Sequence, residues 1–307
     1  MGSIKHSIQY IWEKNWPGIY AAFSGGVPQF IFASHPHNLI DEIPVFCYHC
    51  VDARDFETDL VFLSNNGYIT IDADTLLDHL AMRKKAPKNS VVLTFDDGSR
   101  NLYHTVFPLL KRYGMKAVAF LATKFHDEKF EHSVYNTVNS NNHPLNWSQI
   151  MEMHDSGIID FQSHTHEHRY IPRWPEISDL EGSDVIQLNE SKKSEITVAE
   201  DLKLSKDKLE AKLNKTIRHL AFPRCNGTEE ALCIGESLGY EAFWWCVLPG
   251  RKGNRPGQSP RFIVRIAGRY LRRLPGDGRK PLHEIIIERY SQSAIRLLNY
   301  VKDIGQR

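Results

Sequence analysis

Two short segments of the chain carry the side chains best suited to chemistry. Thr94–Gly98 contains two adjacent carboxylates, Asp96 and Asp97, followed by a glycine, and His164–His168 contains two imidazoles four positions apart. One carboxylate and two imidazoles form a three-ligand site that leaves room for water on a divalent ion. The second carboxylate can then act as a base beside that ion. Together the two segments predict a metal-assisted hydrolase.

Alternating strand and helix patterns predict the elements that must position these segments. Short apolar runs indicate buried strands, and amphipathic runs between them indicate helices. The predicted strands cover 43–48, 67–70, 91–95, 117–122, 158–162, 217–222, 242–247 and 262–267, and the predicted helices cover 56–66, 74–83, 102–113, 147–156, 195–214, 228–238 and 295–304. Repeated strand–helix units argue for an α/β fold with a parallel sheet, open or closed into a barrel. Residues 1–40 are interpreted as an N-terminal extension, and 41–307 as one catalytic domain with a C-terminal helical tail.

Both chemical segments follow directly on a predicted strand. Because the carboxyl ends of parallel strands gather ligand groups at one edge, we expect the aspartates and the histidines to meet there. Gly98 permits a turn that redirects Asp97. A spacing of four residues puts the rings of His164 and His168 on one side if the segment is helical, and it turns His166 away as a wall of the cleft.

Each motif alone has a simpler interpretation. Adjacent aspartates often cap the following helix, and an isolated histidine pair is commonly a solvated accident. Their occurrence at two predicted strand ends favours a metal site over both alternatives. Nitrogen and oxygen donors suit Zn²⁺ best, with Co²⁺ or another first-row ion as the alternative.

Length, composition and charge limit the possible partners. The chain has 307 residues, enough for one barrel-sized domain or two smaller ones. Its net charge of +1 argues against nucleic acid as a partner for the whole molecule. The stretch 251–280 contains ten basic residues and one acid. That stretch could touch an anionic membrane, although pairing with acids elsewhere in the fold is the preferred interpretation.

The cysteines and the start of the chain bear on where the protein works. Five scattered cysteines, an odd number, predict no disulfide scaffold and favour a reducing compartment. Cys47 and Cys50 bracket a predicted strand end, so we interpret them as buried, apolar-like residues rather than a zinc or redox pair. The apolar segment 19–33 is interrupted by polar residues and glycines, which makes it a poor membrane span or signal peptide. We therefore expect a cytoplasmic protein, unless an export signal precedes this sequence.

The sequence resembles the polysaccharide deacetylases, carbohydrate esterase family 4, over about residues 43–270. Thr94–Gly98 and Ser163–His168 are similar to the first two motifs of that family, and Pro44–Val51 is similar to its P-V-x-x-Y-H-x-V start. Supporting similarity lies at 67–68, 107–121 and 145–157. The resemblance implies an irregular (β/α) barrel with about seven parallel strands.

The resemblance also implies a role for each residue of the two main motifs. Asp97, His164 and His168 would bind the metal, and Asp96 would be the general base that takes a proton from water on the ion. Attack on an N-acetyl carbonyl would give an oxyanion that the metal and a backbone N–H stabilise. Arg265 lies where related enzymes carry an arginine that pairs with the base, so a buried salt bridge to Asp96 is expected. The implied function is metal-dependent de-N-acetylation of a glycan that contains N-acetylated amino sugars.

The later motifs depart from the family pattern. The third motif usually has an aromatic residue after a proline, whereas here Arg224 follows Pro223. We assign Pro223, Arg224 and Arg265 to the substrate side of the site, with Arg224 as a possible source of a backbone donor and a positive charge. The family motif that offers the general acid has no clear match. His49 is the stronger candidate for the acid or for a substrate contact, and His283 is the weaker one; a packed strand-end histidine is the alternative for His49.

Two other functions stay open on the sequence. The altered third motif and the missing acid motif are compatible with a degenerate carbohydrate-binding protein that keeps the metal without turnover. The basic stretch 251–280 is compatible with a deacylase that acts on a lipid-linked amino sugar at a membrane.

Overall fold

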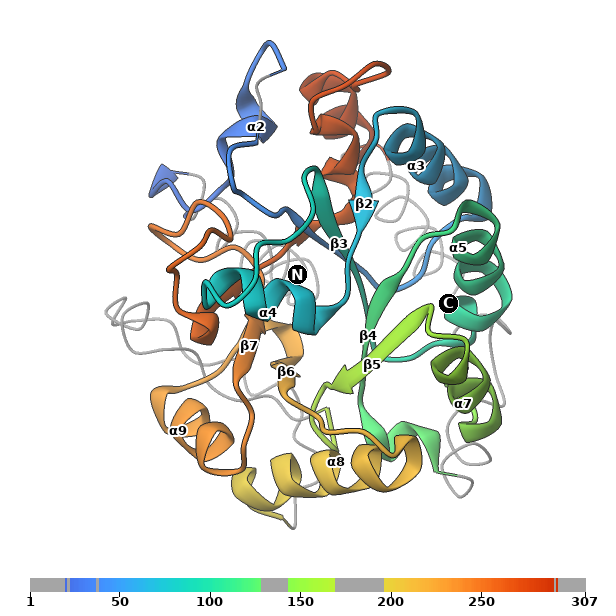
Figure 1. Ribbon diagram of the computed structural model, residues 1–307, viewed down its shortest axis with the longest axis vertical. Helices are drawn as coiled ribbons and strands as arrows, with labels where there is room; N and C mark the ends of the chain where they lie inside the picture. Colours follow the sequence, from blue (N-terminus) through green and yellow to red (C-terminus); the bar gives the residue numbers. More distant parts are fainter. Residues whose placement is uncertain are drawn as a thin grey trace, which may run out of the picture.

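Parallel strands lie side by side around a barrel, and helices cover its outside (Figure 1). The computed structural model describes residues 20, 23–36, 39–127, 143–168, 196–289 and 291. The strands are β1 (Val45–Tyr48), β2 (Ile69–Thr70), β3 (Ser90–Asp96), β4 (Ala117–Leu121), β5 (Ile159–Ser163), β6 (His219–Ala221), β7 (Ala242–Trp245), β8 (Ile263–Val264) and β9 (Ile266–Ala267). The helices are α2 (Gln29–Phe32), α3 (Ala53–Asn65), α4 (Ala73–Leu80), α5 (Phe107–Tyr113), α7 (Trp147–Asp155), α8 (Val198–Leu213) and α9 (Glu229–Ser237). Within these described ranges no helix has the length and apolar character to cross a membrane.

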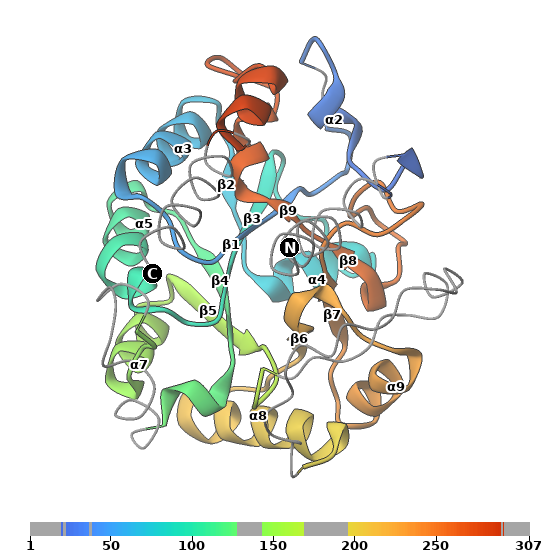
Figure 2. The ribbon, with the colours of Figure 1, turned by 180° about the vertical axis from the view of Figure 1, so that it is seen from behind.

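One extended segment joins the two ends of the sheet. The strand order is β8-β7-β6-β5-β4-β3-β1-β9, with β2 attached to β3 outside this path. β8 pairs with β7 and β9 pairs with β1, and only Arg265 separates β8 from β9 along the chain. The segment 263–267 therefore brings the sheet into a nearly closed barrel, which is also visible from behind in Figure 2. The irregular (β/α) barrel expected from the sequence is confirmed.

Alternate residues of each strand point into the barrel. In β3, Val92 lies in the core cluster inside the barrel, while its neighbours Val91 and Leu93 pack outward against the helices. The same period of two turns Thr94 and Asp96 inward. The inner cluster also contains Leu76, Leu77 and Leu80 of α4, which lies across one end of the barrel in Figure 1. Because α4 closes the end where the strands begin, the carboxyl end is left for a site.

The helix expected over 102–113 is divided into two parts. Leu102–Val106 forms a π-helical turn, and the α-helix α5 begins at Phe107. The reason is Pro108, which has no amide hydrogen to bond four residues back. The helix ends as expected at Gly114, whose left-handed backbone (φ 62°) allows its N–H to bond the carbonyls of Leu110 and Lys111.

The other predicted helices differ from the structure mainly at their ends. Helix α8 begins at Val198 rather than at 195, because Thr197 and Glu200 form a reciprocal capping box. Residues 282–289 are helical. The helix expected over 295–304 lies outside the described residues. The boundary placed at residue 40 stays a prediction.

Most of the basic stretch 251–280 makes structural contacts. Arg273 is buried and donates to the carbonyls of Ile31 and Ala33, which fixes α2 with its buried Phe30 and Ile31 against the barrel. Other basic residues of the stretch form ion pairs: Arg255 with Glu42, Arg261 with Glu229 and Glu236, and Lys280 with Glu288. The preferred interpretation of this stretch, pairing within the fold, agrees with these contacts, and contact with a membrane stays a prediction.

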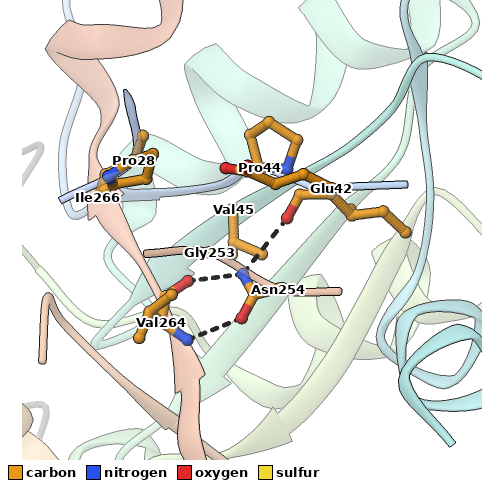
Figure 3. Close-up of a pocket in the computed structure, with 9 residues that line it drawn as sticks. Pro28, Glu42, Pro44, Val45, Gly253, Asn254, Val264 and Ile266 are labelled. Atoms are coloured by element: carbon orange, nitrogen blue, oxygen red, sulfur yellow. Dashed lines mark hydrogen bonds between the residues drawn. The ribbon is translucent and has the colours of Figure 1, made fainter. Parts of the chain in front are cut away.

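The side chain of Asn254 bridges two backbone segments, one at Val264 and one at Ile43 just before β1, that do not bond to each other directly. Its Oδ1 accepts from the Val264 N–H at 2.9 Å, and its Nδ2 donates to the carbonyls of Val264 (2.8 Å) and Ile43 (3.3 Å). Figure 3 shows Asn254 bonded to Val264 in a small cavity beside Pro44. Asn254 therefore links β8 to the residues that lead into β1 where their backbones do not pair.

Replacing Asn254 with alanine should weaken barrel closure. The Asn254→Ala variant leaves three backbone groups without these partners, so we expect the free energy of unfolding to fall by about 2–4 kcal/mol. Urea denaturation of both proteins measures the loss. Asn65→Ala, at an exposed helical position, is the control and should change stability by less than about 0.5 kcal/mol. Equal stability of Asn254→Ala and the wild type would contradict the bridging role.

A partly buried carboxyl group on α3 predicts how stability depends on pH. Burial raises the pKa of Asp59 to about 7, although Arg272 and the Tyr48 hydroxyl oppose the shift. The unfolded chain has an aspartate pKa of about 3.9, so unfolding releases a proton between about pH 4 and 7, and stability falls as pH rises through that window. Asp59→Asn removes this titration, so its stability relative to the wild type should increase between pH 5 and pH 8.

The comparison needs urea unfolding at both pH values. Asp55→Asn, which removes an exposed carboxylate from the same helix, controls for the general effect of lost charge. A difference between Asp59→Asn and the wild type that is the same at pH 5 and pH 8 would show that Asp59 does not titrate in this range.

Candidate metal centre

The first chemical segment turns sharply at the carboxyl end of β3. Asp96 is the last residue of the strand and points inward, while Asp97 and Gly98 adopt left-handed backbone conformations (φ 71° and 72°). At Gly98 a Cβ atom would lie 2.5 Å from Leu121 Cδ2 and 2.7 Å from the His126 ring. Only glycine fits this position, and the turn it allows places Asp97 beside the histidine segment, as the sequence predicted.

The second segment is a loop, which corrects the helical geometry expected for it. Residues 164–168 follow β5 without helical structure, and Thr165 and His168 have φ values of 67° and 54°. These two left-handed residues, rather than a helical repeat, bring the rings of His164 and His168 to a centroid distance of 5.0 Å. His166 turns away, as predicted, and its Nδ1 lies 2.8 Å from the Thr123 hydroxyl.

A buried carboxylate from another element holds this loop. Asp201, in the first turn of α8, is 1% exposed and accepts from the N–H groups of His166 (3.1 Å) and Glu167 (2.8 Å). Both amides lie between the two histidines whose rings face Asp97. The shape of the loop therefore depends on Asp201, a residue that no sequence motif indicated. Its position after a capping-box threonine gives no sign of this contact.

Asp97, His164 and His168 converge on one point. The Asp97 Oδ1 atom lies 3.6 Å from His164 Nε2 and 3.3 Å from His168 Nε2. One ligand atom from each of the three residues lies within 4.8 Å of the other two. The three residues expected to bind a metal are thus brought together by the turns after β3 and β5.

The protonation state of His164 shows that this arrangement fits a cation. His164 Nδ1 lies 2.7 Å from the Ala221 carbonyl, which can only accept, so Nδ1 carries the proton. Burial lowers the pKa of His164 to about 4 against the opposing charge of Asp96, so the ring is neutral and Nε2 presents a lone pair. Among the residues that the structure describes, none donates a hydrogen bond to the buried Asp97 Oδ1 that it faces. Two acceptors 3.6 Å apart repel each other unless a cation lies between them.

Asp96 is paired inside the barrel. Arg265 donates to both of its carboxylate oxygens, at 2.7 and 2.9 Å, and both side chains are buried. Burial alone would raise the pKa of Asp96, but the Arg265 guanidinium holds it well below its usual range. The ion pair expected from the sequence is present. Arg265 is enclosed, with its Nε 3.2 Å from the Trp245 carbonyl, so it can act on a substrate only through Asp96.

The other candidate residues lie at different depths. His49 is 63% exposed, and its Nε2 lies 4.0 Å from Asp97 Oδ2, so it borders the candidate metal site. His283 is exposed in the helical segment 282–289. Arg224 is exposed and Pro223 is buried in the turn after β6, so of these two only Arg224 offers its side chain to the surface.

The cysteines differ from the sequence interpretation in two ways. Cys50 is exposed, because it lies past the end of β1, whereas Cys47 points toward Asp96 with its Sγ 3.5 Å from Oδ2. Cys225 and Cys246 form a disulfide. The two cysteines are 21 positions apart and belong to no recognisable cysteine motif. They become neighbours only when β6 and β7 pair, so no sequence pattern predicted the bond.

The fold and the site together define a (β/α) barrel with a candidate metal centre at the carboxyl ends of its strands. Residues 83–243, just over half of the chain, match the family model described as "Polysaccharide deacetylase". The chain belongs to the polysaccharide deacetylase family. The first two motifs read from the sequence lie within this matched region.

Individual relatives agree with the family assignment. YxkH of Bacillus subtilis (strain 168) is 31% identical over 135 residues, 41% of this chain and 43% of that protein, so the matched part is less than half of YxkH. The poly-beta-1,6-N-acetyl-D-glucosamine N-deacetylase of Staphylococcus aureus (strain MSSA476) is 27% identical over 220 residues, 71% of this chain and 67% of that protein. Among solved structures, IcaB from Ammonifex degensii superimposes with a TM-score of 0.58 and 25% identity over 75% of this chain and 93% of that chain.

The loop contact of Asp201 can be tested through metal affinity. An asparagine at 201 keeps one acceptor but turns an N–H₂ group toward the second amide, so the loop with both histidines should lose its shape. We expect Asp201→Asn to bind Zn²⁺ about 10- to 100-fold more weakly than the wild type, measured by competition with a chromophoric chelator.

The control for this measurement is Asp207→Asn. Asp207 lies on the same helix but is exposed and paired with Lys203. This variant should bind Zn²⁺ like the wild type. Unchanged affinity in Asp201→Asn would show that the loop keeps its shape without the carboxylate.

Proposed function

We propose that this protein is a metal-dependent de-N-acetylase that removes acetyl groups from N-acetylated amino sugars in a glycan. The observation that carries the proposal is the pair of facing acceptors, Asp97 Oδ1 and His164 Nε2, with His168 beside them. A cation between the three residues would relieve the repulsion between these two acceptors. Membership of the polysaccharide deacetylase family supports the choice of an amide of an amino sugar as the bond that is cleaved.

Asp97, His164 and His168 would hold the ion, and the nitrogen and oxygen donor set favours Zn²⁺ or another first-row ion. Such an ion supplies Lewis acidity toward the acetyl carbonyl and lowers the pKa of bound water to about 7. The hydrogen bond from His164 Nδ1 to the Ala221 carbonyl fixes the ring so that Nε2 faces Asp97 Oδ1 and would be available to the ion.

Asp96 is the proposed general base. Its carboxylate lies at the end of β3, directly before the ligand Asp97, and Arg265 keeps it ionised and fixed in orientation. An ionised carboxylate in this place can accept the proton of the attacking water. Arg265 therefore acts as a positioning residue, because it touches the base and is enclosed by the barrel.

His49 is the proposed general acid. When the C–N bond of the amide breaks, the leaving nitrogen must take up a proton to depart as an amine. His49 is exposed at the rim and lies on the side of Asp97 Oδ2, away from the Oδ1 atom that faces the metal ligands. A substrate over the candidate centre could thus meet the base inside the barrel and the acid at its edge.

The proposed substrate is a glycan with N-acetylglucosamine units. The S. aureus relative is named for poly-β-1,6-N-acetyl-D-glucosamine, and its similarity to this chain supports testing that polymer first. Arg224, exposed in the turn after β6, is the proposed contact on the substrate side. Because Arg224 stands where the family usually has an aromatic residue, glycan binding without turnover is the alternative that the experiment must separate.

Acetate release tests the proposal directly. We expect the purified protein to release acetate from β-1,6-linked N-acetylglucosamine oligomers, to lose activity with a chelator, and to regain it with Zn²⁺. Asp96→Asn should lower kcat by about 10²- to 10⁴-fold, because general-base catalysis contributes that much. Asp155→Asn, an exposed position at the end of α7, is the matched control and should keep full activity.

Each part of the proposal has its own contradicting result. Full activity of Asp96→Asn would remove the assigned base, and chelator-resistant activity would remove the metal. Glycan binding with no acetate release across a panel of N-acetylated oligomers would favour the non-catalytic alternative.

A further inference from the structure

A disulfide joins two neighbouring loops at the rim of the candidate site. Cys225 lies in the turn after β6 and Cys246 directly follows β7, and their Cα atoms are 5.4 Å apart. Ala221 of β6 pairs with Trp244 of β7, so the two strands end side by side and the cysteines that follow them are neighbours. The bond thus connects the turn that carries Arg224 to a strand end held by the sheet.

The turn held by this bond has an unfavourable backbone. Arg224 and Cys225 are consecutive residues other than glycine, with φ values of 53° and 57° in the left-handed region. Such conformations persist only where the surroundings impose them. The turn has two backbone hydrogen bonds of its own, from Cys225 N–H to the Phe222 carbonyl and from Asn226 N–H to the Pro223 carbonyl. The covalent link at Cys225 adds a further restraint on this conformation.

Packing limits the position of Gly227, which follows the turn. A Cβ atom at Gly227 would lie 2.8 Å from the Trp245 ring and 2.9 Å from the Phe222 ring. The chain therefore passes tightly over two aromatic side chains before α9 begins. Among residues 222–226, between the end of β6 and Gly227, Arg224 is the exposed one.

The orientation of the candidate ligand His164 does not depend on the disulfide. His164 is oriented by the Ala221 carbonyl, and Ala221 belongs to β6, whose backbone is paired on both sides. Loss of the bond would remove this restraint from the turn that carries Arg224, while His164 keeps its partner. The two parts of the site should therefore respond differently to reduction.

We propose that the Cys225–Cys246 disulfide is a positioning bond that fixes Arg224 at the rim for substrate binding. The role of Arg224 toward a glycan rests on the function proposed above, whereas the restraint on the turn does not. Formation of the bond removes one proton and one electron from each thiol, and a protein or small-molecule disulfide accepts both electrons by thiol–disulfide exchange. The active form would then belong to an oxidising compartment, in contrast to the cytoplasmic location expected from the cysteine count.

The bond itself is tested by thiol counting on the denatured protein. Cys47, Cys50 and Cys233 remain as thiols in the structure, so three of the five cysteines should react before reduction and all five afterwards. Peptide mapping without reduction should recover Cys225 linked to Cys246. Five reactive thiols in protein produced under oxidising conditions would overturn the proposal.

Trypsin tests the restraint without any assumption about activity. The protease cuts after Arg224 only when the turn can adapt to its active site, so cleavage reports local opening. We expect cleavage at Arg224 to be about tenfold faster or more after reduction with a phosphine, which avoids the zinc binding of dithiols. Samples are quenched and fully reduced before mass spectrometry, so that the new terminus at Cys225 is counted equally. Equal cleavage rates in both states would overturn the proposal.

Kinetics then test the role of the turn in binding. With the bond broken by reduction, or in Cys225→Ser/Cys246→Ser, KM for the N-acetylglucosamine oligomer should rise by roughly threefold or more while kcat changes less than about twofold. Reduction should not change the double variant further. In Arg224→Ala the same reduction should leave KM nearly unchanged, because the residue that the bond positions is gone.

Cys233→Ser is the matched control. Cys233 is an exposed thiol on α9, and this variant should keep the wild-type response to reduction. A kcat loss with constant KM, or an undiminished KM effect of reduction in Arg224→Ala, would show that the bond does not act through Arg224. If the oxidised protein releases no acetate from any oligomer, the proposed function fails, and the trypsin result still decides whether the bond restrains the turn.

Discussion

The buried ion pair between Asp96 and Arg265 connects the chemistry of this protein to the closure of its barrel. Asp96 ends strand β3, and Arg265 lies between β8 and β9, the segment that pairs with both ends of the sheet. Removal of one partner from a buried pair leaves an uncompensated charge and typically costs about 3–5 kcal/mol. The same residue that keeps the proposed base ionised therefore lies where the barrel closes. A change that breaks this ion pair would therefore affect both the ionisation of the proposed base and the closure of the barrel.

Around this rigid pair, the site consists of turns with unfavourable backbone conformations. Asp97, Thr165, His168, Arg224 and Cys225 all have positive φ values without being glycine. Each such residue costs of order 1–3 kcal/mol and requires compensation nearby. The compensation differs from turn to turn: Asp201 accepts two amides of the histidine loop, and a disulfide restrains the turn after β6. The barrel supplies strand ends at fixed positions, and these local contacts determine where the ligands point.

The parts of the structure that the sequence could predict are those that depend on local patterns. The strand ends placed Asp97 near His164 and His168, because parallel strands share one carboxyl edge. The family resemblance supplied the barrel and the arginine partner of Asp96. The helical geometry considered for the histidine segment was wrong, because a spacing of four residues also fits a loop with two left-handed residues. Asp201 and the Cys225–Cys246 bond depend on contacts between separate elements, which no spacing in the sequence reveals.

The interruption of the closing segment at Arg265 also limits how the chain can misfold. In a strand the side chains alternate between faces, so a slip of one residue would turn Val264 or Ile266 into the barrel and Arg265 out of it. Asp96 would then be a lone charge in an apolar interior, and the slipped register would be strongly disfavoured. The buried charge of Asp96 thus favours the strand alignment that brings Arg265 to it. In a molecule with this alignment, the proposed base is already ionised.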